Sequence, residues 1–154
     1  MLMTKTLAVS AIKNGVVIDH IPAGQALYLV RLLKLSDRNK QVTLAINLKS
    51  GSKGYKDIVK LEEYRLTADE CAKIAVICPN ATLNTIENYE VTDKSKVVLP
   101  DRIDDIFPCP NDKCISNHEP MSASFLIQEY RQGIRLRCHY CNKCFSQEDA
   151  LPLR

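Results

Sequence analysis

The segments Cys109-Pro-Asn-Asp-Lys-Cys114 and Cys138-His-Tyr-Cys141 decide how the C-terminal third of this 154-residue chain can fold. Two cysteine pairs, each on a short turn and separated by 23 residues, have the spacing with which four thiolates surround a zinc ion. Four sulfur ligands leave no coordination position open for water, so we expect the metal to be structural and not catalytic. The sequence therefore predicts one structural zinc ion per chain, held by Cys109, Cys114, Cys138 and Cys141.

The choice of the second cysteine pair is ambiguous on spacing alone. Cys144 follows Cys141 at the interval that separates Cys138 from Cys141, so either combination could complete the site. We favour Cys138 and Cys141, because the run that ends at Cys138 has the pattern of a strand entering a turn, and Cys144 begins the strand that leaves it. His118 and His139 lie near the ligands in sequence, and we interpret both as solvated loop residues.

Composition limits the class of protein. The length fits one domain or two small ones, and a unit of about fifty residues needs a metal to be stable. Seven cysteines are an odd number, and with four of them assigned to zinc they indicate a reducing compartment, so we expect a cytoplasmic protein. The apolar runs are too short for a signal peptide or a membrane span, and no membrane association is expected.

Charge is distributed unevenly between the two parts of the chain. Residues 1–100 carry 14 Lys and Arg against 10 Asp and Glu, whereas residues 101–154 carry 7 against 8. A zinc unit that binds nucleic acid is expected to be basic, and this one is slightly acidic. We therefore expect no nucleic-acid partner.

Hydrophobic periodicity predicts the order of helices and strands. A hairpin is expected over residues 7–18 with its turn at Asn14-Gly15, followed by a helix over about 23–35 whose apolar face is Ala26, Leu27, Val30 and Leu33. A second hairpin over 42–61, a helix that begins at the capping box Thr67-Ala-Asp-Glu70 and ends at Pro79, and strands over 81–86 and 89–99 complete the first part.

This order favours an α+β fold. Residues 1–100 are predicted to form a ferredoxin-like domain, a mainly antiparallel sheet with two helices on one face. Residues 101–154 are predicted to form a small all-β zinc-bound domain, with strands over 124–130 and 134–138 and another from residue 144.

Catalytic signatures are missing from the sequence. It contains no phosphate-binding glycine loop, nucleophile elbow or H-E-x-x-H motif. Lys56, Lys60, Lys94 and Lys96 lie on expected strands and could form a polyanion site, although a solvated sheet face explains them as well. Asp19 and His20 precede a helix, where they could meet a ligand or simply be solvated. An enzyme that uses Asp19 and His20 as an acid–base pair is a rival interpretation, but the sequence shows no accompanying nucleophile or open metal site.

Several segments taken together resemble one known family. They are Val17-Ile-Asp-His-Ile-Pro22, Asn88-Tyr-Glu-Val91, Leu99-Pro-Asp-Arg-Ile-Asp104, Cys109-Pro-Asn111 and Cys114-Ile-Ser116. In this order and at these intervals, from about Val9 to Phe145, they resemble the regulatory chain of aspartate carbamoyltransferase. The resemblance implies an N-terminal allosteric domain that binds nucleoside triphosphates, a C-terminal zinc domain that docks on the catalytic chain, and no activity in the chain itself.

The resemblance also implies particular site residues and partners. Lys94, His20 and Asn84 would meet the phosphates, Asp19 and Lys60 the ribose and base region, and Lys56 the phosphates or a second nucleotide. The walls around the base and sugar would be Val9, Ala11, Ile12, Val17, Ile86, Tyr89 and Val91. The ligands would be CTP and ATP, with UTP as a further candidate, and the assembly would be a homodimer of regulatory chains within a dodecameric holoenzyme that takes part in pyrimidine biosynthesis.

The resemblance places Asn111, Lys113 and Asn142 at the interface with the catalytic chain. Two of these positions depart from the enteric form of the family: Lys113 stands where that form has an asparagine, and Asn142 where it has an acidic residue. Cys144 is an additional cysteine. We therefore expect the docking loop to be retained, while the sign and size of each effector's response stay open.

Overall fold

The computed structural model describes residues 11–51, 54–131 and 133–150. Backbone contacts divide these residues into two compact units. The first comprises residues 11–66 and 80–96, and the second comprises residues 67–79 and 97–150, apart from the gaps already given. The predicted boundary near residue 100 stays a prediction, and the helix over residues 68–77 belongs to the second unit.

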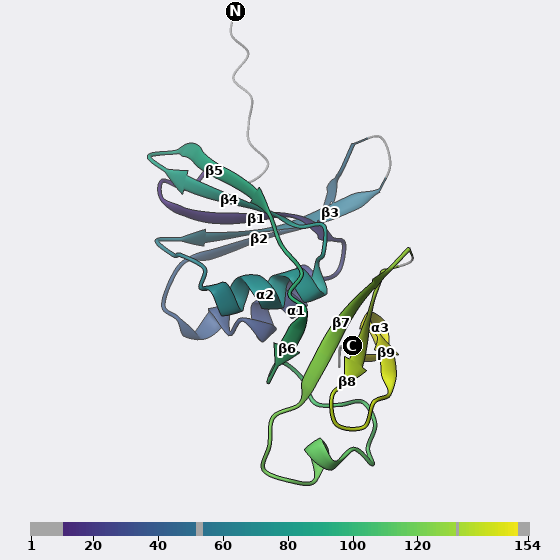
Figure 1. The fold of residues 1–154 in the computed structure, drawn as a ribbon. Helices are drawn as coiled ribbons and strands as arrows, with labels where there is room; N and C mark the ends of the chain where they lie inside the picture. Colours follow the sequence, from purple (N-terminus) through teal and green to yellow (C-terminus); the bar gives the residue numbers. More distant parts are fainter. Residues whose placement is uncertain (1–10, 52–53, 132, 151–154) are drawn as a thin grey trace, which may run out of the picture. The chain divides into compact units, whose positions relative to one another are not determined.

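The first unit is built on a five-stranded antiparallel sheet (Figure 1). Its elements are β1 (Gly15–Pro22), α1 (Ala26–Leu32), a 3₁₀ turn (Leu35–Asp37), β2 (Val42–Lys49), β3 (Tyr55–Glu62), β4 (Thr82–Glu87) and β5 (Glu90–Lys96). The strand order is β2-β3-β1-β4-β5. Strands β1 to β4 have the order of a ferredoxin-like fold, with β5 added at the edge by a hairpin. The predicted α+β class and antiparallel sheet are confirmed.

Alternation of apolar and polar residues gives the sheet two different faces. Val16 and Ile18 of β1 are buried, as are Val59 and Leu61 of β3, which pair with them as Val16 with Leu61 and Ile18 with Val59. Directly paired residues of antiparallel strands lie on one face of the sheet, so these four side chains line the core. The intervening residues of both strands are partly exposed and lie on the opposite face.

A buried carboxylate fixes the start of α1. Asp57 of β3 is fully buried, and one of its oxygens, Oδ2, accepts hydrogen bonds from the backbone N–H groups of Gly24 (3.0 Å) and Ala26 (3.2 Å). The other oxygen, Oδ1, accepts from Asn47 N–H at 3.0 Å, at an irregularity in the β2–β3 pairing. One carboxylate therefore satisfies three backbone donors on two elements.

Two local predictions in this unit need correction. Helix α1 is shorter than expected, and Leu27, expected on its apolar face, is 54% exposed, whereas Leu29 is buried. The predicted Asn14-Gly15 turn is not a hairpin turn, because Gly15 already lies in β1 with φ +144° and residues 11–14 are not in a strand. A Cβ at Gly15 would lie 2.0 Å from the Leu61 carbonyl oxygen, so glycine permits close strand approach there. The other half of the predicted hairpin, residues 7–10, lies outside the described residues.

The second unit combines a small sheet with two helices. It contains α2 (Ala68–Ile77), β6 (Arg102–Asp104), a 3₁₀ turn (Ile115–Asn117), β7 (Ser124–Tyr130), β8 (Gly133–Cys138), β9 (Cys144–Ser146) and α3 (Gln147–Ala150). The sheet order is β6-β7-β8-β9, and every neighbouring pair is antiparallel. The three predicted strands are confirmed, whereas β6 and α3 were not predicted.

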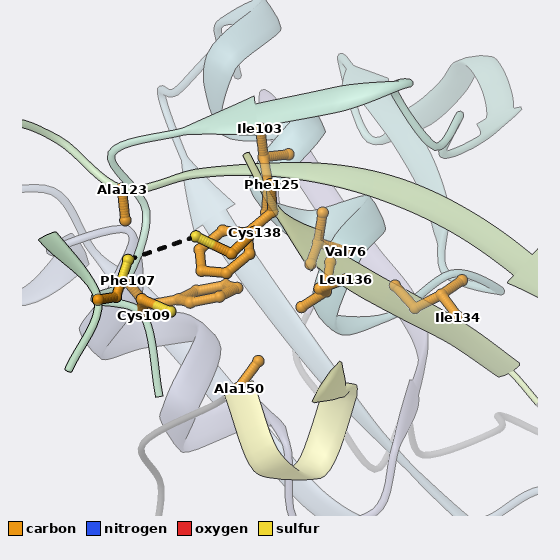
Figure 2. Close-up of a cluster of buried hydrophobic side chains, with 11 residues drawn as sticks. Val76, Ile103, Phe107, Cys109, Ala123, Phe125, Ile134, Leu136, Cys138 and Ala150 are labelled. Atoms are coloured by element: carbon orange, nitrogen blue, oxygen red, sulfur yellow. Dashed lines mark hydrogen bonds between the residues drawn. The ribbon is translucent and has the colours of Figure 1, made fainter. Parts of the chain in front are cut away.

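Helix α2 begins with the predicted capping box. The Thr67 side chain accepts a hydrogen bond from Glu70 N–H at 3.1 Å, and the Glu70 carboxylate accepts from Thr67 N–H at 3.2 Å. Val76 of this helix belongs to the core of the second unit, together with Phe125, Leu136 and Ala150 (Figure 2). The Gln147 side chain of α3 donates a hydrogen bond to the Val76 carbonyl, which ties α3 to α2.

Candidate functional site

The register of the first sheet aligns four predicted nucleotide-site residues in one row. Val17 of β1 pairs with Lys60 of β3 on one side and with Asn84 of β4 on the other, and Asn84 pairs with Lys94 of β5. Paired residues lie on one face of an antiparallel sheet, and the face of Val17 is the one opposite the core. Residues that are up to 77 positions apart in sequence, from Val17 to Lys94, are thereby brought into one line across the sheet.

Asp19 and His20 lie at an irregularity of β1 on this face. The β1–β3 register shifts between Ile18 and Ile21, and His20 adopts a positive φ of 59°. Its N–H donates to Asp19 Oδ1 at 2.6 Å, and its ring nitrogen Nδ1 lies 3.1 Å from Thr82 Oγ1. The bulge thus turns the imidazole toward β4 and leaves His20 partly exposed.

Lys56 completes this cluster through an ion pair. Its Nζ lies 2.9 Å from Asp19 Oδ1, and both side chains are about one-fifth exposed (22% and 20%). Burial by itself raises the pKa of Asp19, but the hydrogen bonds from Lys56 and from His20 N–H, with the positive charge of Lys56, outweigh it and lower the pKa below 3.8. Asp19 is therefore ionised at neutral pH and holds Lys56 beside His20.

The remaining lysines of this face differ in environment. Burial lowers the pKa of Lys60, because partial desolvation disfavours the ammonium group. Lys94 is exposed on the edge strand β5, whose residues are all exposed. An anion bound over the row would compensate the desolvation of Lys60 and meet an exposed ammonium group at Lys94.

The predicted apolar residues lie toward one end of the sheet. Ile86 of β4 pairs with Gly15 and with Val91, and Tyr89 occupies the β4–β5 turn with a positive φ of 69°. Tyr89 N–H donates to the Lys13 carbonyl at 2.9 Å, which brings residues 11–13 beside this turn. Ile12 is buried, Ala11 is exposed, and Val9 lies outside the described residues. Tyr89 and Val91 are 65% and 57% exposed, so two apolar side chains face solvent there.

Thr82 of this face was not among the predicted site residues, and Lys96 was named only as one of four lysines that could form a polyanion site. Thr82 is buried and pairs with Asp19 on one side and with Lys96 on the other, and its hydroxyl contacts the His20 ring. The sequence gives no signal for Thr82, because a threonine in a strand is ordinarily a packing residue. Lys96 shares the face of Lys94, since the two are separated by one residue on the same strand.

The four predicted metal ligands meet in the second unit. The sulfur atoms of Cys109, Cys114, Cys138 and Cys141 all lie within 4.8 Å of one another. The Cys109–Cys141 and Cys114–Cys138 sulfur distances are 3.8 and 3.7 Å. A tetrahedron with zinc–sulfur bonds of about 2.3 Å has edges of about 3.8 Å, so the set fits zinc. Cys144 is exposed and is not part of the cluster, so the clustered set is the one that contains Cys138 and Cys141.

The four thiols differ in how far their surroundings favour the thiolate: burial raises the pKa of Cys109 and Cys138, whereas hydrogen bonds lower the pKa of Cys114 and Cys141. Burial raises the pKa of Cys141, but the Lys143 backbone N–H and the Asn111 side chain outweigh it and lower the pKa to about 7. Cys109 and Cys138 are buried beside the aromatic pair Phe107 and Phe125 (Figure 2), whose ring centroids lie 5.1 Å apart. The site is thus closed on one side by the core, as a structural metal site requires.

The predicted partner-facing residues lie around this cluster. Asn111 accepts a hydrogen bond from Lys113 N–H at 3.1 Å, and Lys113 itself is exposed. Asn142 is exposed, with a positive φ of 63°. His118 contacts the Asp112 carbonyl at 2.7 Å, and His139 stacks edge-on against Tyr140, so neither histidine is among the clustered ligands.

None of the helices in the described residues combines the length and the apolar character that crossing a membrane requires.

Comparison with known proteins assigns both parts of the chain to one family. Residues 7–98 match the family model described as "Aspartate carbamoyltransferase regulatory chain, allosteric domain", and residues 101–151 match the one described as "Aspartate carbamoyltransferase regulatory chain, metal binding domain".

Curated relatives match along almost their whole length. Aspartate carbamoyltransferase regulatory chains from Vibrio parahaemolyticus and Escherichia coli are 44% and 46% identical, over 92% and 94% of this chain and 93% and 95% of their own length. The regulatory chain from Chromobacterium violaceum is 41% identical over 99% of this chain and all of its own length. On these matches, this chain belongs to the family of aspartate carbamoyltransferase regulatory chains.

Proposed function

We propose that this chain is a non-catalytic subunit that binds nucleoside triphosphates on the outer face of its first sheet and transmits their effect to the catalytic chain of aspartate carbamoyltransferase. Residues 1–100 would form the nucleotide-binding domain, and residues 101–154 the zinc domain that docks on the partner. The ligands would be CTP and ATP, with UTP as a further candidate.

The observation that supports the nucleotide site best is the row of paired residues across β3, β1, β4 and β5. It aligns Lys60, Asn84 and Lys94 on the face that also carries Asp19, Lys56 and His20. A triphosphate carries several negative charges, and ammonium and imidazole donors bind it as point charges without a glycine-rich loop. The exposed Tyr89 and Val91 at the end of the sheet would take the base, whose exposed face needs apolar cover.

Opposite responses to two nucleotides at one site follow from differential affinity. An inhibitor must bind one quaternary state more tightly, and an activator the other. A coupling of about 1–3 kcal/mol changes the affinity by about 5- to 150-fold, which a few contacts can supply. In the family the regulated enzyme acts in pyrimidine biosynthesis, and we propose that this chain supplies the same feedback control.

The zinc unit would connect this sensor to its partner. The ligand loop Cys109–Cys114 carries Asn111 and Lys113, and Asn142 follows ligand Cys141, so metal binding fixes the surface that these residues present. We propose that the chain forms a homodimer within a dodecameric holoenzyme. None of the seven cysteines, all of which lie within the described residues, is in a disulfide, which supports a reducing cytoplasmic setting.

Calorimetric titration of the full zinc-loaded chain with CTP and ATP tests the nucleotide site. Lys94→Ala and His20→Ala should each weaken binding by about 10-fold or more, because a hydrogen bond to a charged group contributes about 1.5–3 kcal/mol. Lys40→Ala is the matched control, since Lys40 is an exposed lysine of the first unit that lies outside the strands of the row, and it should bind like the parent. Parent-like binding by Lys94→Ala and His20→Ala would show that the site is misplaced.

A second experiment tests the partner. Mixing the zinc-loaded chain with purified catalytic trimers should give a larger complex by analytical ultracentrifugation, and the zinc-free chain should not. Equal complex formation by the zinc-free and the zinc-loaded chain would refute the docking role of the second unit.

A further inference from the structure

Ser116 and Asn117, two and three residues after zinc ligand Cys114, have contacts that the proposed function leaves unexplained. Ser116 is 8% exposed, and its Oγ lies 3.1 Å from the Cys114 sulfur, which is itself 1% exposed. The Asn117 amide nitrogen Nδ2 donates to two carbonyl oxygens, that of Cys109 at 2.9 Å and that of Asn111 at 2.8 Å. Both side chains therefore point back onto the first ligand loop.

The Ser116 contact has a defined direction once the metal is bound. A zinc-bound cysteine is a thiolate and carries no proton, so the serine hydroxyl must be the donor. A hydrogen bond to a thiolate withdraws charge from the sulfur and reduces the charge that it gives to the metal. Because both groups are buried, water cannot replace this donor if the hydroxyl is removed.

The Asn117 contacts act on the shape of the loop. A terminal amide has two N–H donors, and here they serve the carbonyls at the start and in the middle of the Cys109–Cys114 loop. The Asn111 carbonyl also accepts from Cys114 N–H at 2.9 Å, and the Asn111 side chain accepts from Lys113 N–H at 3.1 Å. Asn117 therefore closes a loop whose two ends are zinc ligands.

We propose that Ser116 and Asn117 are outer-shell residues of the zinc site with separate tasks: the Ser116 hydroxyl sets the charge on the Cys114 sulfur, and the Asn117 amide fixes the loop that carries Asn111 and Lys113. The consequence for docking rests on the proposed function. The consequence for the metal does not, and it can be measured on the chain alone.

Cobalt substitution of the full chain separates the two tasks. In Co²⁺-loaded protein the sulfur-to-metal charge-transfer absorption reports the charge on the thiolates. Ser116→Ala should move this absorption to lower energy, because the sulfur keeps more charge. It should also weaken zinc binding about 10-fold in chelator competition, because the buried thiolate loses a hydrogen-bond donor that water cannot replace. Ser116→Thr retains the hydroxyl and should restore the parental spectrum. Ser122→Ala, at an exposed serine of the same unit, is the control and should change neither quantity.

Variants of Asn117 should weaken zinc binding without moving the charge-transfer absorption through loss of a sulfur hydrogen bond. Asn117→Asp keeps the shape of the side chain, removes both donors and places a carboxylate against two carbonyl oxygens, so zinc affinity should fall by about 10- to 100-fold. Asn117→Ala adds no charge and should leave the charge-transfer energy of the cobalt form unchanged. Asn117→Ala should show a smaller loss of zinc affinity, and it tests the role of the amide if the aspartate variant does not fold. Docking on the catalytic trimer should weaken in parallel.

The roles proposed for Ser116 and Asn117 can be refuted independently of each other. A Ser116→Ala spectrum identical to that of the parent would overturn the role of the hydroxyl, and parental zinc affinity in Asn117→Ala would overturn the role of the amide. If zinc affinity behaves as expected and no variant, nor the parent, binds the catalytic trimer, then the outer-shell assignment stands and the proposed function is wrong.

Discussion

Replacing Asp57 by Asn removes one of the three hydrogen bonds that attach α1 and β2 to β3. The Asp57 carboxylate is fully buried and accepts from the N–H groups of Gly24, Ala26 and Asn47. A carboxamide has one oxygen. In its better orientation it keeps the two bonds to Gly24 and Ala26, and its NH₂ group then faces the Asn47 N–H donor.

The size of the effect follows from these contacts. A buried hydrogen bond to a charged group contributes about 1.5–3 kcal/mol, and a buried donor left unpaired costs about 1–3 kcal/mol. We therefore expect Asp57→Asn to destabilise the first unit by about 3 kcal/mol. Asp57→Ala leaves three donors unpaired and should cost about 6 kcal/mol, which is comparable to the whole stability of a domain, about 5–15 kcal/mol.

Native-state hydrogen exchange measures this locally, without assuming that the two units unfold together. The amides of Gly24, Ala26 and Asn47 should exchange about 100-fold faster in Asp57→Asn, since 1.4 kcal/mol corresponds to about tenfold. Asp93→Asn, at an exposed aspartate of β5, is the matched control and should change stability by less than about 0.5 kcal/mol. Parental exchange at all three amides in Asp57→Asn would refute this account of how α1 is anchored.

Three further perturbations have defined outcomes. Gly15→Ala should destabilise the first unit by about 3 kcal/mol in urea titrations, because the new Cβ would lie 2.0 Å from the Leu61 carbonyl oxygen. At Gly24 a new Cβ would meet no neighbouring atom within 4 Å, so Gly24→Ala should cost about 1 kcal/mol through backbone strain alone. Equal losses of stability in the two variants would contradict the contact argument. Lys56→Met should raise the pKa of Asp19 in an NMR titration, because the ion pair at 2.9 Å helps to lower it. Since the folded-state pKa of Asp19 is depressed, its contribution to stability is present above about pH 3.8 and is lost as the pH falls through the folded-state pKa. The stability of Lys56→Met should therefore lose this dependence on acid pH, whereas that of Lys40→Met should keep it. Removing zinc with a chelator should abolish exchange protection in β7 and β8 and leave the β1–β3 pairing protected; protection retained in β8 would mean that the metal does not hold the second unit together.

The sequence predicts the elements well where one physical rule dominates. The metal ligands follow from spacing, the start of α2 from the Thr67–Glu70 capping box, and the β2–β3 hairpin from period-two alternation. The side of α1 that is buried was predicted less well, because the helix has seven residues and apolar side chains on several sides, so periodicity could not choose between Leu27 and Leu29.

The candidate nucleotide site depends on information that a linear sequence does not contain. The row from Lys60 to Lys94 exists because of strand order and register, and a shift of one residue would move each side chain to the other face. The bulge at His20 and its contact with Thr82 likewise depend on tertiary pairing. The individual residues could be nominated through family resemblance, whereas their alignment could not.

The grouping of α2 affects how this chain can be dissected. The polypeptide passes between its two units three times, after residues 66, 79 and 96, so no single cut separates them. A recombinant fragment that began at residue 101 would omit Val76 and its carbonyl, and with them a core side chain and the acceptor for Gln147. Chimeras that exchange the metal-binding half between relatives should therefore carry residues 67–79 along with it.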